Sequence, residues 1–103
     1  MASPENPPGK PVVTIRYCRL CGWLLRAAWL AQELLSTFSE ELGGVLLEPG
    51  TGGVFEIEVA GRLVWERKRD AGFPGAAELK RRVRDAAFPE RELGHMERKD
   101  PAP

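Results

Sequence analysis

The hydrophobic pattern of this chain changes period at Gly22, and that change limits the folds open to it. Before Gly22, residues 12–18 are rich in β-branched and aromatic side chains and follow a proline, which predicts a β-strand. After Gly22, apolar residues recur at spacings of three and four, which predicts an amphipathic helix ending at Gly43-Gly44. The expected buried stripe of this helix consists of Leu24, Ala28, Ala31, Leu35, Phe38 and Leu42.

Four more segments complete the pattern: short strands at 45–48, 54–59 and 62–66, and a second helix at 76–88. We expect the second helix to bury Leu79, Val83 and Ala86. Its other side carries a basic stripe, which we expect in solvent, consisting of Lys80, Arg81, Arg82 and Arg84.

The last two strands form a hairpin whose turn decides which side chains share a face of the sheet. A two-residue turn at Ala60-Gly61 needs positive φ at both residues, and alanine disfavours that conformation. We therefore expect a three-residue loop, Val59-Ala60-Gly61, with Gly61 in the left-handed bulge position. The resulting pairs are Ile57 with Leu63, Phe55 with Trp65 and Glu58 with Arg62.

The predicted order is therefore β-α-β-β-β-α, a small α/β fold. The first strand–helix–strand unit is expected to be a right-handed crossover between parallel strands, to which the hairpin adds antiparallel partners. The result is a thioredoxin-like fold with a four-stranded mixed sheet and two helices packed on it. We expect this thioredoxin-like domain to span residues 12–88, with a flexible lead at 1–11 and a polar tail at 89–103.

Composition narrows the function classes. Fifteen Lys and Arg residues balance fifteen Asp and Glu residues, so the net charge of zero argues against nucleic acid or anionic membrane as a partner. The most apolar stretch is shorter than the ~20 residues that span a bilayer, and no secretory signal is visible. We therefore expect a cytoplasmic protein. Phosphate loops and dinucleotide fingerprints are missing from the sequence, so no bound cofactor is expected.

Two cysteines, Cys18 and Cys21, join the end of the first strand to the start of the first helix. Unpaired amide groups at a helix start carry partial positive charge and favour a thiolate, and redox CxxC motifs use this setting to lower a cysteine pKa. Arg19 adds a cation within the loop. Two intervening residues bring the sulfurs close enough to form a disulfide, so we predict a dithiol/disulfide pair as the catalytic centre.

Three other interpretations of the pair compete with this one. A structural disulfide closing a four-residue loop contributes only about 2 kcal/mol, and the cytosol tends to reduce it. A zinc site needs four ligands, and His95 is the only other soft ligand in the sequence, so we predict no metal site. Buried, inert cysteines are the third alternative, which the polar, glycine-flanked turn disfavours.

Three segments resemble the selenoprotein W-like proteins of the SelT/SelW/SelH (Rdx) group. They are a strand leading into Cys-x-x-Cys-Gly-Trp at 13–23, a Gly-Thr-rich loop and Gly-turned hairpin at 50–64, and Gly-Phe-Pro at 72–74. The resemblance implies a thioredoxin-like fold and a thiol–disulfide oxidoreductase in cell redox homeostasis, with glutathione or a thiol protein of the thioredoxin type as redox partner. This chain is similar to the form with cysteine in place of selenocysteine.

The resemblance also bears on the roles of single residues. Cys21 stands where the family holds selenocysteine, which implies that Cys21 attacks and Cys18 resolves, whereas thioredoxin-type logic implies the reverse order. The loop of Thr51 and Gly52 occupies the place of the thioredoxin cis-proline. The substrate-binding residues that we predict are Trp23, Thr51, Gly52 and Phe73.

A second hypothesis comes from a different functional class. The chain would then be a redox-sensitive adaptor without catalytic activity. Trp29 lies off the expected helix stripe, so it is either an isolated surface side chain or a contact for a partner. In the adaptor hypothesis, Trp29 and the basic stripe carry the binding.

Overall fold

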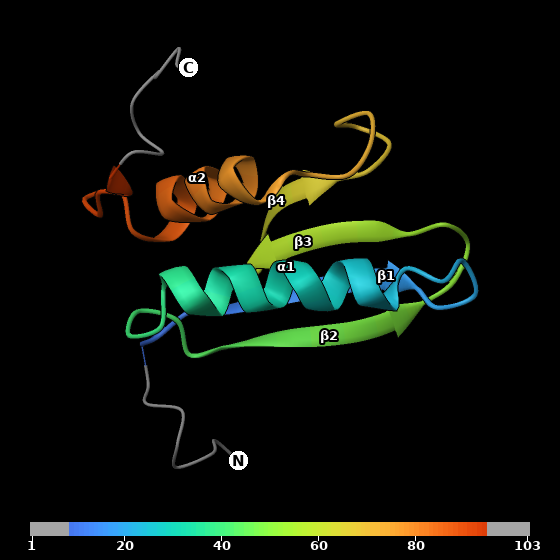
Figure 1. Ribbon diagram of the computed structural model, residues 1–103, viewed down its shortest axis with the longest axis horizontal. Helices are drawn as coiled ribbons and strands as arrows, with labels where there is room; N and C mark the ends of the chain where they lie inside the picture. The colour runs from blue at the N-terminus through green and yellow to red at the C-terminus, as the bar shows by residue number, and fades with distance from the viewer. Residues whose placement is uncertain (1–8, 95–103) are drawn as a thin grey trace.

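Both helices lie on one face of a four-stranded sheet in the computed structural model, which describes residues 9–94 (Figure 1). The elements are β1 Val12–Cys18, α1 Leu24–Thr37, β2 Gly44–Gly50, β3 Phe55–Val59, β4 Arg62–Glu66 and α2 Ala76–Ala87. The strands lie in the order β2-β1-β3-β4, with β1 and β2 parallel and the other pairs antiparallel. The predicted thioredoxin-like β-α-β-β-β-α fold is confirmed.

Strand β1 lies in the middle of the sheet, and its side chains alternate between the two faces. Val13, Ile15 and Tyr17 are buried on the face that the helices cover. Arg16 faces the other side, where it forms ion pairs with the neighbouring strands at Glu48 (3.0 Å), Glu56 and Glu58 (3.6 Å). The hydrogen bonds that Arg16 donates to the carboxylates of Glu48 and Glu56 raise its pKa, so ion pairs connect the strands on the uncovered face.

The buried face of α1 differs from the predicted stripe. Leu24 and Leu35 were expected in the core, yet they are 46% and 41% exposed. Ala31, Phe38 and Leu42 of the predicted stripe are buried, and Ala27, Leu30 and Leu34 join them in the core. Because apolar residues also recur at 23, 27, 30 and 34, one position before each of 24, 28, 31 and 35, the helix has two possible stripes about 100° apart. Contact with the sheet selects between them, and that contact is not visible in the helical period alone.

Helix α1 also ends earlier than predicted. Its last residue is Thr37, and Gly43-Gly44 does not cap it. The segment after it turns back on itself, with the amide of Leu42 donating to the carbonyl of Phe38 at 3.0 Å, and both of these side chains are buried. Serine and threonine at 36, 37 and 39 are weak helix formers. A tight turn therefore buries the same two apolar side chains that a longer helix would have buried.

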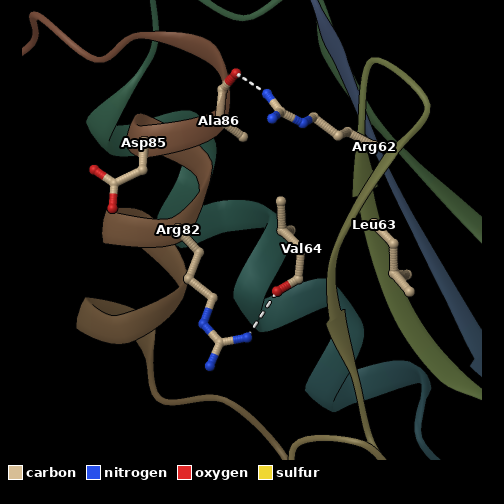
Figure 2. A pocket seen from close by; sticks show the side chains of 6 residues that line it. All are labelled: Arg62, Leu63, Val64, Arg82, Asp85 and Ala86. Atoms are coloured by element: carbon tan, nitrogen blue, oxygen red, sulfur yellow. Dashed lines mark hydrogen bonds between the residues drawn. The ribbon is translucent and has the colours of Figure 1, made fainter.

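The predicted three-residue hairpin loop is wrong. Ala60 and Gly61 form a two-residue turn with φ of 52° and 81°, and Val59 pairs with Arg62. A bulge then places Val64 as an extra residue, so that Glu58 faces Leu63 and Ile57 faces Trp65. Leu63 consequently points away from α2, while Val64 points toward it (Figure 2).

Burial explains why this hairpin is preferred. The bulge places Val64 and Trp65, at 7% and 6% exposure, in the core together and leaves Leu63 41% exposed. A left-handed alanine costs roughly 1–2 kcal/mol. With this turn and no bulge, Trp65 would lie opposite Glu56 on the uncovered face, so the bulge returns it to the core beside Val64. Burying that side chain gains about 1.5–3 kcal/mol, which offsets the strain at Ala60. A rule based on the turn residues alone could not include this gain.

Helix α2 covers β3 and β4 and buries Leu79 and Val83, as predicted, while Ala86 is half-buried. Lys80 was expected in solvent with the rest of the basic stripe, but it is only 6% exposed. Its Nζ lies 2.8 Å from Oε1 of Glu33 on α1. The approach of α1 therefore turns a position of the polar face into a contact between the two helices.

The turn after β4 is organised by the carboxylate of Asp70. This group accepts hydrogen bonds from the amide of Glu66 (2.9 Å) and from Arg69, and it forms an ion pair with Arg82 (3.2 Å). Burial alone would raise the pKa of Asp70, but these partners outweigh burial and lower it from 3.8 to about 2. The native state therefore prefers the ionised carboxylate more strongly than the unfolded chain does.

We expect Asp70→Asn to lower the free energy of unfolding by about 1–2 kcal/mol at neutral pH, since it removes a charged acceptor from three donors. Because the native pKa lies below the unfolded value, the contribution of Asp70 is present above pH 4 and is lost as the pH falls toward 2. Urea unfolding at several pH values should show that the free energy of unfolding falls less in the variant than in wild type as the pH is lowered. Asp85→Asn, at a side chain 69% exposed, is the matched control, and an equal effect there would contradict the assignment.

The core continues beyond α2, because Leu93 is 7% exposed and packs into it. Arg91 holds this segment by donating to the carbonyl of Thr37 (2.8 Å) and pairing with Glu41 (2.8 Å). The boundaries predicted for the lead, the domain and the tail stay predictions. Within residues 9–94, neither helix has the length and apolar character needed to cross a membrane.

Candidate redox site

Three loops meet at one end of the sheet. Strands β1, β2 and β4 run in the same direction, so the segments that follow them, 19–23, 51–54 and 67–75, lie at the same end (Figure 1). In α/β sheets, the carboxyl ends of parallel strands are where ligands usually bind. The predicted redox pair lies at this end, with Cys18 as the last residue of β1 and Cys21 in the segment that follows.

Cys18 and Cys21 form a disulfide, with their Cα atoms 5.3 Å apart. The two sulfurs differ in environment, because Cys18 is 1% exposed at the end of β1 whereas Cys21 lies in an exposed turn. The amide of Arg19 donates to the carbonyl of Gly50 at 2.9 Å and so ties this turn to the end of β2. The pair is thus asymmetric, with one cysteine accessible to a partner and the other enclosed.

Helix α1 begins directly after this turn, at Leu24, with Trp23 as its N-cap residue. No side chain caps this end of the helix and its first turn contains no acidic residue. The positive end of the helix dipole is therefore not compensated by a carboxylate from the helix itself. This is a setting that favours an anion, such as a thiolate, just before the helix.

An aromatic cluster lies at the same end, made of Trp23, Phe55 and Phe73. The ring of Phe73 lies 4.9 Å from Trp23 and 5.0 Å from Phe55, in edge-to-face geometry. Trp23 and Phe73 were predicted to bind substrate, and the structure brings them together although they are 50 residues apart. Phe55 is fully buried beneath them and was not among the predicted site residues. Its adjacency to Phe73 depends on sheet pairing.

Two arginines cover this cluster. The guanidinium of Arg26 lies 4.2 Å from the centre of the Phe73 ring, and that of Arg67 lies 5.1 Å from the centre of the Trp23 ring. Arg67 also donates through Nε to the carbonyl of Gly53 at 3.1 Å. Among residues 9–94, neither guanidinium has an ion pair with a carboxylate. The site therefore has two cations available for an anionic group.

The segment after β2 contributes the remaining predicted residues. Thr51 and Gly52 are exposed and follow Gly50, which pairs with Cys18 across the sheet. A side chain at Gly50 would be tightly confined, because a Cβ there would lie 2.9 Å from Cγ1 of Val54 and 3.6 Å from Cγ of Arg16. Gly50 thus positions the redox turn through its carbonyl and leaves room for Val54. The binding roles of Thr51 and Gly52 stay predictions.

We expect Gly50→Ala to lower the free energy of unfolding by about 1–3 kcal/mol, since a branched side chain must move to admit the methyl group. The change should also shift the loop that follows β2 and slow disulfide exchange. Urea unfolding and exchange rates check both effects. The double variant Gly50→Ala/Val54→Ala should recover most of the stability and exchange rate that Gly50→Ala alone loses. If the double variant recovers nothing, the contact with Val54 is not the cause.

A shallow pocket lies at the opposite end of the hairpin, between β4 and α2 (Figure 2). It is lined by Arg62, Leu63, Val64, Arg82, Asp85 and Ala86, of which Arg82 alone was given a binding role, as part of the basic stripe in the adaptor hypothesis. Arg62 donates there to the carbonyl of Ala86 at 3.2 Å, and Arg82 donates to the carbonyl of Val64 at 2.9 Å. Both guanidinium groups of this pocket therefore already donate hydrogen bonds to backbone carbonyls.

In the described part of the chain, no three His, Cys, Asp or Glu side chains gather closely enough to hold a metal ion. His95, the remaining soft ligand of the sequence, lies outside the described residues.

Known proteins resemble this chain at the level of sequence. A family model described as the Rdx family matches residues 12–85, which include the cysteine pair. Two proteins named Migration and invasion enhancer 1 are each 36% identical to it, over 77 residues for Mus musculus and 86 for Bos taurus. These alignments cover 73% and 81% of this chain and 64% and 71% of the relatives. The chain therefore spans a little under two thirds of the mouse protein's length.

Solved structures resemble it as well. A selenoprotein W-related protein from Vibrio cholerae superposes with a TM-score of 0.75 at 57% identity, covering 77% of this chain and 99% of that one. A protein from Bordetella parapertussis superposes with a TM-score of 0.74 at 60% identity, covering 75% and 98%. The predicted resemblance to selenoprotein W-like proteins is thus confirmed. With its fold, its cysteine pair and these matches in agreement, the chain belongs to the Rdx family.

Proposed function

We propose that this protein is a thiol–disulfide oxidoreductase that cycles between a Cys18–Cys21 dithiol and disulfide. The observation that carries the proposal is the asymmetric cysteine pair at the strand-to-helix junction, with Cys21 exposed and Cys18 enclosed. A nucleophile must reach its partner, whereas a resolving thiol needs only to reach its neighbour. The membership of the Rdx family and the similarity to a selenoprotein W-related protein support the same chemistry.

The proposed cycle balances in two steps. The Cys21 thiolate attacks one sulfur of a substrate disulfide, so that this disulfide breaks, a mixed disulfide forms and the leaving thiolate takes a proton from water. Cys18 then loses its proton and attacks the Cys21 sulfur, which releases the second substrate thiol and forms the Cys18–Cys21 disulfide. The substrate gains two electrons and the protein loses two. A thiol donor, either glutathione or a protein of the thioredoxin type, returns them.

Substrate binding is assigned to the surroundings of this pair. Trp23 and Phe73 form an apolar wall, and the exposed loop of Thr51 and Gly52 offers backbone groups to an extended chain. Arg26, over Phe73, is a cation near enough to this wall to attract a carboxylate of glutathione. We expect the reaction to occur in the cytoplasm, where glutathione keeps thiols reduced.

Redox titration tests the proposal. The protein is equilibrated with glutathione buffers, its free thiols are alkylated, and the fraction of disulfide is read by mass. We expect a single two-electron transition at a potential of about −180 to −270 mV, the range of thioredoxin-like catalysts. A disulfide that stays oxidised below about −300 mV would instead be structural and would contradict the proposal.

A redox-sensitive adaptor is the second candidate, and the exposure of Trp29 (47%) favours it. An adaptor predicts that binding to a partner persists in both Cys18→Ser and Cys21→Ser variants. The oxidoreductase predicts that covalent capture of a partner depends on which cysteine is replaced.

A further inference from the structure

Large apolar side chains are exposed mainly on one side of the molecule. Seven are exposed in the part of the chain that the structure describes, and five of them lie between residues 20 and 35. We call these five the α1 surface; they are Leu20, Leu24, Leu25, Trp29 and Leu35. The other two, Leu46 and Leu63, occupy strand positions in register with Thr14 and Glu58 on the sheet face away from the helices.

The α1 surface is continuous with the redox turn. Leu25 (81% exposed) and Trp29 (47%) lie one helical turn apart on the side of α1 opposite its buried residues, so their side chains are neighbours. Leu20 (72%) stands between the two cysteines, next to Cys21. A partner covering Leu20 and Leu25 would therefore also reach the exposed cysteine.

The charge of the redox turn and the first part of α1, residues 18–32, is of one sign, and Glu33, the next acidic residue, pairs with Lys80 of α2. From Cys18 to Gln32 the chain contains Arg19 and Arg26 and no Asp or Glu. Both arginines are exposed, and within residues 9–94 neither is ion-paired with a carboxylate. If a second copy of the chain docked through the same region, arginines of the two copies would lie near one another. Residues 18–32 contain no carboxylate that could neutralise their charge. Charge complementarity therefore favours an acidic partner.

We propose that the α1 surface is the docking site for a protein substrate whose disulfide lies beside apolar residues flanked by carboxylates. The proposal rests on the proposed oxidoreductase function and names its substrate class. Docking would hold the substrate sulfur beside Cys21 and so raise the effective concentration of the reacting groups. The exchange itself follows the two steps given above.

Single-turnover exchange with the fully reduced protein tests this proposal. Two synthetic peptides each carry one cysteine as a mixed disulfide with thionitrobenzoate, beside leucines flanked by glutamates in one peptide and by lysines in the other. Attack by Cys21 on the peptide sulfur releases coloured thionitrobenzoate and forms a Cys21–peptide disulfide, which Cys18 then resolves. Hydroxyethyl disulfide, which is too small to span the α1 surface, reports the intrinsic reactivity of the cysteines.

We expect the acidic peptide to react about tenfold faster than the basic one, with a preference that falls as salt is added. The double variant Leu25→Ser/Trp29→Ser should slow the acidic peptide about tenfold, a loss typical of removing an interface anchor. Its rate with hydroxyethyl disulfide should stay unchanged. Leu46→Ser, at a leucine 52% exposed on the sheet face away from the helices, is the matched control and should leave every rate unchanged.

Three results would overturn the proposal. Equal rates for the two peptides would show that the partner need not be acidic. If the double variant reacted with the acidic peptide as fast as wild type, the α1 surface would not be the docking site. Sedimentation that shows a dimer abolished by Leu25→Ser/Trp29→Ser would assign this surface to a second copy of the chain. If the wild type fails with hydroxyethyl disulfide as well, the proposed function itself has failed, and the docking proposal with it.

Discussion

Cys18→Ser is expected to accumulate a stable mixed disulfide between Cys21 and glutathione when the reduced variant meets oxidised glutathione. Cys21 is exposed, so it can attack, but the serine at position 18 cannot release the bound thiol. Intact-protein mass should show one added glutathione. The adduct should disappear on treatment with a reducing agent.

Cys21→Ser supplies the comparison. Its remaining thiol, Cys18, is 1% exposed and cannot meet a bulky disulfide without local opening of the site. We expect its exchange rate to fall by about a hundredfold or more relative to wild type, as when a covalent nucleophile is removed. The double variant should form no adduct. If Cys21→Ser traps glutathione and Cys18→Ser does not, the thioredoxin-type order of attack holds instead.

Phe55→Ala is expected to produce the largest loss of stability. The ring of Phe55 is fully buried at the start of β3, 5.0 Å from Phe73 and 6.2 Å from Trp23. Its removal leaves a cavity beneath the aromatic cluster, which should lower the free energy of unfolding by about 3–5 kcal/mol. The urea midpoint measures this loss, and the surviving folded protein should also exchange disulfides more slowly because Trp23 and Phe73 lose their support.

Leu63→Ala is the matched control for that experiment. Leu63 lies on the adjacent strand β4 but is 41% exposed, so its truncation should change the free energy of unfolding by less than about 0.5 kcal/mol. Similar losses in the two variants would mean that the bulge does not separate buried from exposed positions in β4 as described.

Helix α1 and the hairpin both differ from what the sequence predicts, and for the same physical reason. In α1 the helical period was recognised correctly, yet Leu24 and Leu35 are exposed because two stripes were available and the sheet selected the other one. In the hairpin, Ala60 disfavours positive φ, yet the two-residue turn forms, and a bulge several residues away keeps Trp65 in the core beside Val64. Both errors arose where a local preference competed with a distant contact.

Some features of the candidate site follow from the sequence, whereas others depend on the tertiary structure. The spacing of Cys18 and Cys21, their place between a strand and a helix, and the order of the six elements follow from the sequence, because period and turn chemistry are local properties. Tertiary structure alone decided which cysteine is enclosed and that Trp23, Phe55 and Phe73 meet beneath two arginines. Those residues come from separate loops and strands, and only the register of the sheet brings them to one end of the molecule.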